Sequence, residues 1–126
     1  MVSVGLHTLP KEERLCSRKA LEELFGGGHQ SLSAYPIRAV FMPNGLGAVR
    51  VMFSVSKRYF KRAVKRNRIK RQLREAYRLQ KELLQPLGVG LDIAFLWTCD
   101  ELMPTEKVFQ RMHNIVQRIH ESVAGQ

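Results

Sequence analysis

The spacing of hydrophobic residues predicts both strands and helices. From Tyr35 to Met42 and from Ala48 to Val55, β-branched and aromatic residues are typical of two strands, and Pro43-Asn44-Gly45 between them indicates a turn. We therefore expect these strands to form a hairpin. The segment from Leu91 to Trp97 is apolar except for Asp92, which predicts a buried central strand.

Three other segments have the three-to-four-residue period of amphipathic helices. The first has Thr8 as a candidate cap and Pro10 near its first turn, and the glycines at 26–28 end it. The second lies in the third quarter of the chain and ends at Pro86, Gly88 and Gly90. The third opens at Pro104-Thr105-Glu106. The apolar stripes are Leu15, Leu21, Leu24 and Phe25 in the first helix; Ile69, Leu73, Ala76, Tyr77, Leu83 and Leu84 in the second; and Val108, Phe109, Met112, Ile115, Val116 and Ile119 in the third.

These elements follow one another in the order α-β-β-α-β-α, and a further short strand is expected near Leu32. This order predicts an α+β fold. The 126 residues contain no internal repeat and no long linker, and they suit one domain spanning 1–126.

Positive charge changes this picture because it is clustered. The chain has 21 Lys and Arg residues against 11 Asp and Glu residues, a formal net charge of +10. Eleven of the 21 fall between Lys57 and Arg78, where Glu75 is the one acid. Such density favours a polyanion as partner, RNA first. On the predicted second helix the residues opposite the apolar stripe project together; they are Asn67, Lys70, Arg71, Arg74 and Arg78.

The two cysteines indicate neither zinc nor a disulfide framework. Cys16 and Cys99 are far apart and lie outside any CxxC spacing, so we expect buried thiols in a reducing, cytoplasmic compartment. No export signal and no apolar stretch of 18 residues occurs, so we expect no membrane partner.

Motifs for catalysis are mostly absent, and we expect neither a small-molecule substrate nor a catalytic or metal-binding side chain. His113 and His120 are seven residues apart, but Glu121 is the one carboxylate or thiol ligand near them. Asp92, Asp100 and Glu101 surround a strand end where acids could hold Mg²⁺, but a role in turns is favoured.

A longer pattern surrounds the sequence Arg66-Asn67-Arg68. A strand ending Ser54-Val55-Ser56-Lys57 precedes it, and Ile69-Lys70-Arg71 continues it. This pattern closely resembles the signature of the bacterial ribonuclease P protein subunit, the basic partner of a catalytic RNA. The resemblance extends from Arg14-Leu15 to the closing helix.

The chain departs from that family's pattern at two places. Tyr59-Phe60 stands where the family commonly has a glycine, and this interval is one residue longer. Leu21 aligns with a position where the family tends to have an aromatic residue.

The resemblance implies a two-layer α/β sandwich, ribosomal-protein-like, with a mixed sheet and a left-handed β-α-β crossover, against the general preference for right-handed ones. It also implies a function: binding the catalytic RNA and the 5′ leader of precursor tRNA, and assisting removal of the leader. In such a complex the RNA holds the Mg²⁺ ions that perform hydrolysis, and one protein copy is expected per RNA.

The resemblance assigns two sets of binding residues. Expected contacts to the catalytic RNA are Arg62, Lys65, Arg66, Asn67, Arg68, Lys70, Arg71 and Arg74. Expected contacts to the leader are Arg14, Arg18, Phe25, Tyr35, Ser56 and Lys57. Asn67 could fix the turn into the helix or read a base edge. Phe25 and Tyr35 could stack on bases or belong to the core.

Two other functions use the same charge. A ribosome-associated protein could bind rRNA through this helix without any turnover. A sequence-specific DNA-binding protein would need a helix-turn-helix, and here the basic helix follows a strand directly, which counts against it.

Overall fold

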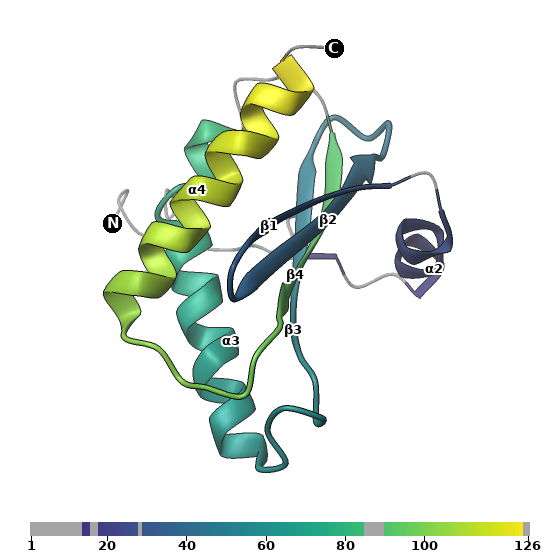
Figure 1. Cartoon of the computed structure of the whole chain (residues 1–126). Coiled ribbons are helices and arrows are strands. Elements are labelled where there is room, and N and C mark those ends of the chain that lie inside the picture. The colour runs from purple at the N-terminus through teal and green to yellow at the C-terminus, as the bar shows by residue number, and fades with distance from the viewer. Residues whose placement is uncertain (1–13, 16–17, 28, 85–89, 125–126) are drawn as a thin grey trace, which may run out of the picture.

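The computed structural model describes residues 14–15, 18–27, 29–84 and 90–124. Within these ranges, helices and strands follow one another as the sequence predicts, including the short strand at Leu32 (Figure 1). The elements are α2 (Arg18–Gly26), β1 (Gln30–Ala34), β2 (Ile37–Pro43), β3 (Val49–Val55), α3 (Ala63–Arg78), the 3₁₀ turn η2 (Lys81–Leu83), β4 (Leu91–Trp97) and α4 (Thr105–Ala124). None of these helices is long and apolar enough to cross a membrane.

The four strands form one mixed sheet in the order β1-β2-β4-β3. β4 pairs antiparallel with β2 and parallel with β3, so the predicted hairpin between β2 and β3 is wrong. The hairpin joins β1 to β2 instead, through Tyr35 and Pro36, and Tyr35 therefore lies in a turn and not in a strand. β4 is buried along nearly its whole length, and its apolar side chains gain most in the middle of the sheet. The β3-α3-β4 unit is the crossover that the resemblance implies; its left-handed sense stays a prediction.

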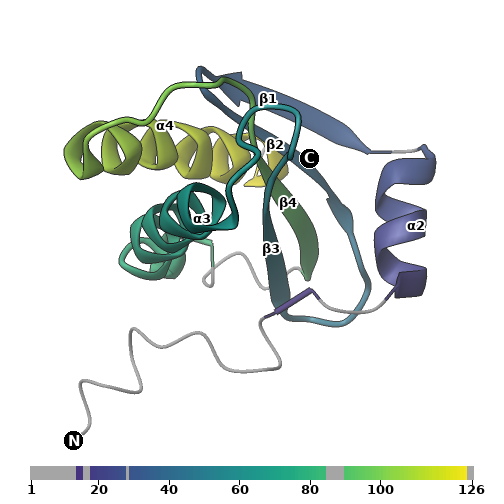
Figure 2. The ribbon, with the colours of Figure 1, turned by 90° about the horizontal axis from the view of Figure 1, so that it is seen from below.

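Helices cover both faces of the sheet, unequally. Figure 2 shows α3 and α4 together on one face and α2 alone on the other. The larger core lies under α3 and α4, and alternate strand residues such as Phe41, Ile93 and Phe95 point into it. The residues between them, Val40 and Ala94, meet α2 in a smaller cluster. The predicted two-layer sandwich is thus the main body of the fold, and α2 adds a small cover on the second face.

The start of the first predicted helix is also corrected. Arg14 forms a parallel bridge with Val51 at the outer edge of β3, and the Leu15 N–H donates to the Val51 carbonyl at 2.7 Å. The extended backbone at Arg14 and Leu15 therefore hydrogen-bonds to the outer edge of β3, whose backbone groups would otherwise face solvent. Within the described residues the helix begins at Arg18; the predicted Thr8 cap and the Pro10 opening lie outside them, as does Cys16.

The apolar stripes of the two long helices are largely confirmed. The stripe residues of α3 are buried, as is Leu84 after the helix; those in α3 are Ile69, Leu73, Ala76 and Tyr77. All predicted stripe residues of α4 except one are buried as well. The exception is Phe109, which is 37% exposed because it lies at the flank of the stripe. α3 ends at Arg78, earlier than expected, and the Gln80 side chain donates to the Ala76 carbonyl at 3.0 Å where the helix stops.

A partly buried charge pair connects the middle of the sheet to the loop between β2 and β3. Arg50 lies opposite Asp92 in the β3–β4 register and donates to both of its carboxylate oxygens at 2.8 Å. The Asn44 side-chain amide donates to the same carboxylate, also at 2.8 Å. At Gly90 a Cβ atom would lie only 2.6 Å from the Gly47 nitrogen, so glycine is required for this close approach. Asp92 therefore lies within β4 and not in the turn that the sequence favoured, and its carboxylate is held by Arg50 and Asn44.

Candidate nucleic-acid interface

The solvent-facing side of α3 is a row of cations. Its outer face, defined as Asn67, Lys70, Arg71, Arg74 and Arg78, lies opposite the buried stripe, as the helical period predicts. In the described residues Arg78 pairs with Glu75 at 2.6 Å, whereas the cations from 57 to 74 form no ion pair with an acid. Unneutralised charges on a rigid helix favour binding to closely spaced phosphates.

The residues around the start of α3 differ in what they contact. Arg62, Lys65 and Arg68 are exposed, and so is Asn67. The turn into the helix is fixed by Arg66, whose Nη1 donates to the carbonyls of Phe60 and Lys61, each at 2.8 Å. The role of fixing this turn, which the sequence left open for Asn67, therefore belongs to Arg66.

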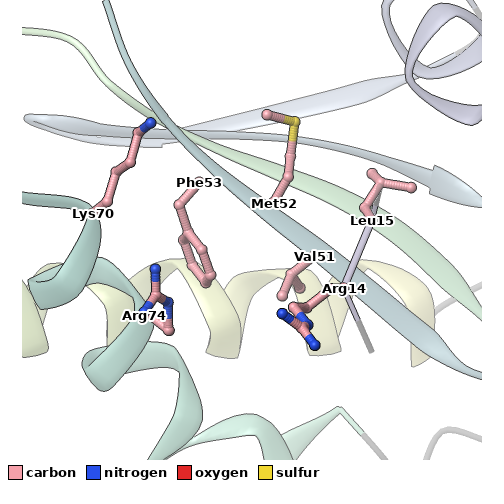
Figure 3. A pocket seen from close by; sticks show the side chains of 7 residues that line it. All are labelled: Arg14, Leu15, Val51, Met52, Phe53, Lys70 and Arg74. Atoms are coloured by element: carbon pink, nitrogen blue, oxygen red, sulfur yellow. The ribbon is translucent and has the colours of Figure 1, made fainter. Parts of the chain in front are cut away.

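A groove lies along the outer edge of β3. It has a volume of about 190 Å³ and is lined by Arg14, Leu15, Val51, Met52, Phe53, Lys70 and Arg74 (Figure 3). The half-buried Phe53 ring, which stacks on Phe95 with 5.6 Å between centroids, lies between the two α3 cations and Arg14. We call this the edge groove. An aromatic ring among cations suits a nucleotide, whose base can stack while its phosphate is paired.

Two of the three cations in this groove belong to the expected RNA-binding set, and Arg14 belongs to the expected leader-binding set. The structure therefore places one member of the leader-binding set beside two members of the RNA-binding set. Sequence reasoning missed Phe53, because the residue pattern from Ala48 to Val55 does not show that this strand forms the outer edge of the sheet.

Both aromatic residues expected to contact the leader are exposed, so neither belongs to the core. Phe25 is 47% exposed at the end of α2, and Tyr35 is 62% exposed in the β1–β2 turn. They lie beyond opposite ends of β1 and do not form one stacking surface.

The surroundings of Tyr35 are acidic. A side-chain hydrogen bond with Cys99 is the main cause that raises the pKa of the Tyr35 phenol. Glu101 and Asp100 raise the same pKa further. Negative charges repel phosphates, which disfavours Tyr35 as a stacking surface for an RNA base.

The other residues expected to contact the leader are dispersed. Arg18 is the first residue of α2, and its Nε atom lies 3.5 Å from Oε1 of Glu22. Ser56 and Lys57 follow β3, and the Ser56 hydroxyl accepts a hydrogen bond from the Arg58 N–H at 3.1 Å. Within the described part of the chain, no three His, Cys, Asp or Glu residues lie together as metal ligands.

A basic helix that directly follows an edge strand, with a cationic groove beside it, defines a small α+β RNA-binding protein. The family model described as Ribonuclease P matches residues 9–120, and the chain belongs to this family. A Ribonuclease P protein component of Porphyromonas gingivalis is 38% identical and covers 98% of this chain and 94% of its own length. The Ribonuclease P protein component of Chromohalobacter salexigens is 27% identical, over 93% of this chain and 89% of its own length.

Solved structures have the same fold. The RNase P protein of Thermotoga maritima superposes with a TM-score of 0.71 at 25% identity, over 84% of this chain and 96% of that one. The Staphylococcus aureus RNase P protein gives a TM-score of 0.72 at 20% identity, over 85% and 94%. The mixed α+β architecture is thus that of ribonuclease P proteins.

Proposed function

We propose that this chain acts as the protein component of ribonuclease P, which binds a catalytic RNA and precursor tRNA and assists removal of the 5′ leader. The family match over most of the chain supports this role. Relatives that match nearly the whole chain are named for the same component, so a ribosome-associated rRNA-binding protein is not favoured.

The outer face of α3 carries the proposal. Its cations lie on a helix anchored by Ile69, Leu73 and Tyr77 in the main core, so their positions are set before any RNA binds. Preorganised arginines can contact phosphates in bidentate fashion without first ordering a flexible segment. We assign this face to the catalytic RNA.

The edge groove is the proposed path for the leader beside that RNA. Arg14 would pair with a leader phosphate, Phe53 offers an aromatic surface at the groove floor, and Lys70 and Arg74 form the border between the leader and the catalytic RNA. Single-stranded RNA is bound in this way by proteins that combine cations with stacking surfaces.

Catalysis is assigned to the RNA, which would hold the Mg²⁺ ions. The buried carboxylate of Asp92 is already occupied by Arg50 and Asn44, so it does not suit a catalytic metal. The protein would raise affinity for the substrate and screen repulsion between two polyanions. One copy per RNA and a cytoplasmic location stay predictions.

Reconstitution tests this function. The protein is added to ribonuclease P RNA and precursor tRNA at an Mg²⁺ concentration at which the RNA alone cleaves poorly. We expect cleavage at the mature 5′ end to increase. Binding to both RNAs without increased cleavage would support a purely rRNA-binding role and contradict the proposal.

Replacing Phe25 with alanine tests the leader contact. If its ring stacks on a leader base, F25A should weaken binding of the holoenzyme to precursor tRNA by about 1 to 3 kcal/mol and leave binding of mature tRNA unchanged. F109A removes a similarly exposed ring from α4 and serves as the control. Equal losses for both tRNAs, or an equal effect of F109A, would show that Phe25 does not contact the leader.

A further inference from the structure

The segment between β3 and α3 is a turn that is held at both ends. We call residues 57–62 the basic turn. At its start the carbonyl of Ser56 accepts hydrogen bonds from the N–H groups of Tyr59 and Phe60, at 3.1 and 3.3 Å. The Ser56 hydroxyl accepts a third from the Arg58 N–H. These bonds fix the backbone as it leaves β3.

Phe60 and Arg66 hold its second half. The Phe60 ring is 6% exposed and belongs to the main core. One guanidinium nitrogen of Arg66 bonds both the Phe60 and the Lys61 carbonyls from the first turns of α3. The backbone of the turn is therefore fixed relative to the helix by a core anchor and by two hydrogen bonds from a cation.

Four exposed cations stand on this fixed backbone: Lys57, Arg58, Lys61 and Arg62. Arg58 lies over the Tyr59 ring, 5.8 Å from its centroid. Lys61 and Arg62 make no side-chain hydrogen bond or ion pair with other described residues. Figure 1 shows the turn at the end of the molecule opposite the last turns of α4, beyond the sheet.

This arrangement costs free energy through self-repulsion, and a polyanion would relieve that cost. Beside it, Val64 is 79% exposed in the first turn of α3, so none of the described residues covers the start of the helix. A protruding surface with fixed cations can enter a groove of a folded RNA.

We propose that the basic turn is a preformed phosphate-binding site for the ribonuclease P RNA, in which Lys61 and Arg62 contact phosphates and Arg66 is a positioning residue that holds the turn. The inference rests on the proposed function and deepens it, since it separates Arg66 from the arginines that contact RNA directly. Arg68, which is exposed and bonds no backbone carbonyl among the described residues, is still expected to contact the RNA directly.

The first experiment measures the affinity of the full chain for ribonuclease P RNA over a range of salt concentrations. The variant K61A/R62A leaves Arg66 and both backbone carbonyls in place. The slope of log K against log salt is negative. If each side chain binds one phosphate, the magnitude of this slope should decrease by about 0.7 to 0.9 for each phosphate no longer bound, or about 1.4 to 1.8 in total. K107A/R111A removes two exposed cations from α4 and should leave the slope unchanged.

A double-mutant cycle tests the positioning role. If Arg66 holds the turn, R66A should lower the slope by more than a single phosphate accounts for, and adding K61A/R62A to R66A should change it little further. If Arg66 instead binds a phosphate itself, the effects add and R66A lowers the slope by the amount of one phosphate, which would overturn the positioning role. Circular dichroism checks that R66A is folded; if it is not, R66K takes its place in the cycle.

The outcomes separate this inference from the proposed function. If wild-type protein fails to bind ribonuclease P RNA, the proposed function itself fails. If the wild type binds and R68A lowers the slope while K61A/R62A does not, the docking surface is α3 alone, and only the inference about the basic turn is overturned.

Discussion

Replacing Arg68 and Arg71 together with alanine should weaken binding to ribonuclease P RNA by about 2 to 4 kcal/mol, or roughly 30- to 1000-fold. Both side chains are exposed on α3, and in the described structure neither is neutralised by an acid. Each is therefore available for a charge-assisted hydrogen bond to phosphate. The slope of log K against log salt should also fall by about 1.4 to 1.8.

The matched control is again K107A/R111A, which removes the same charge from α4. A loss of affinity shared equally by both variants would mean that net charge, and not the position of the arginines on α3, determines binding. Full affinity of R68A/R71A would show that this side of α3 does not dock on the RNA. Thermal unfolding should be nearly unchanged, because neither arginine touches the core.

Replacing Asp92 with alanine should lower the free energy of unfolding by about 3 kcal/mol. The change leaves the Arg50 guanidinium, whose side chain is only 21% exposed, without its carboxylate. It also removes one of the two acceptors of the Asn44 side-chain amide in the β2–β3 loop and leaves the other, the Ala48 carbonyl. Urea denaturation measures the loss.

E101A is the control, because it removes an exposed acid that makes no ion pair in the described structure. It should change stability by less than about 0.5 kcal/mol. The double variant R50M/D92L replaces the pair with apolar side chains and should recover much of the loss, since it leaves no uncompensated charge. If D92A is as stable as E101A, the pair contributes nothing to the fold.

Much of the fold could be predicted because its signals are periodic. The stripe of Ile69, Leu73, Ala76 and Tyr77 predicts both the helix and its buried side. Strand pairing could not be predicted in the same way. Adjacent strands joined by Pro43-Asn44-Gly45 read as a hairpin, yet β4, nearly 40 residues further on, lies between them because its apolar side chains gain most in the middle of the sheet.

Part of the candidate site could likewise be predicted from the sequence, and part required the structure. Exposed cations at helical spacing could be read directly from the sequence, and a family resemblance gave them a function. The edge groove depends on β3 being the outer strand, and the pairing of Arg50 with Asp92 depends on the β3–β4 register. The two bonds from Arg66 go to backbone carbonyls, which carry no signature of residue type, so its positioning role needed the structure.

Lysine footprinting tests most directly the claim that the exposed cations of α3 dock on the ribonuclease P RNA. The protein, free and bound to the RNA, is treated with an amine-acetylating reagent, and modification is quantified by mass spectrometry. We predict that RNA protects Lys65 and Lys70 on α3, while Lys19 on α2 and Lys107 on α4 stay as reactive as in the free protein. Protection of Lys19 and Lys107 with Lys65 and Lys70 still reactive would contradict the account.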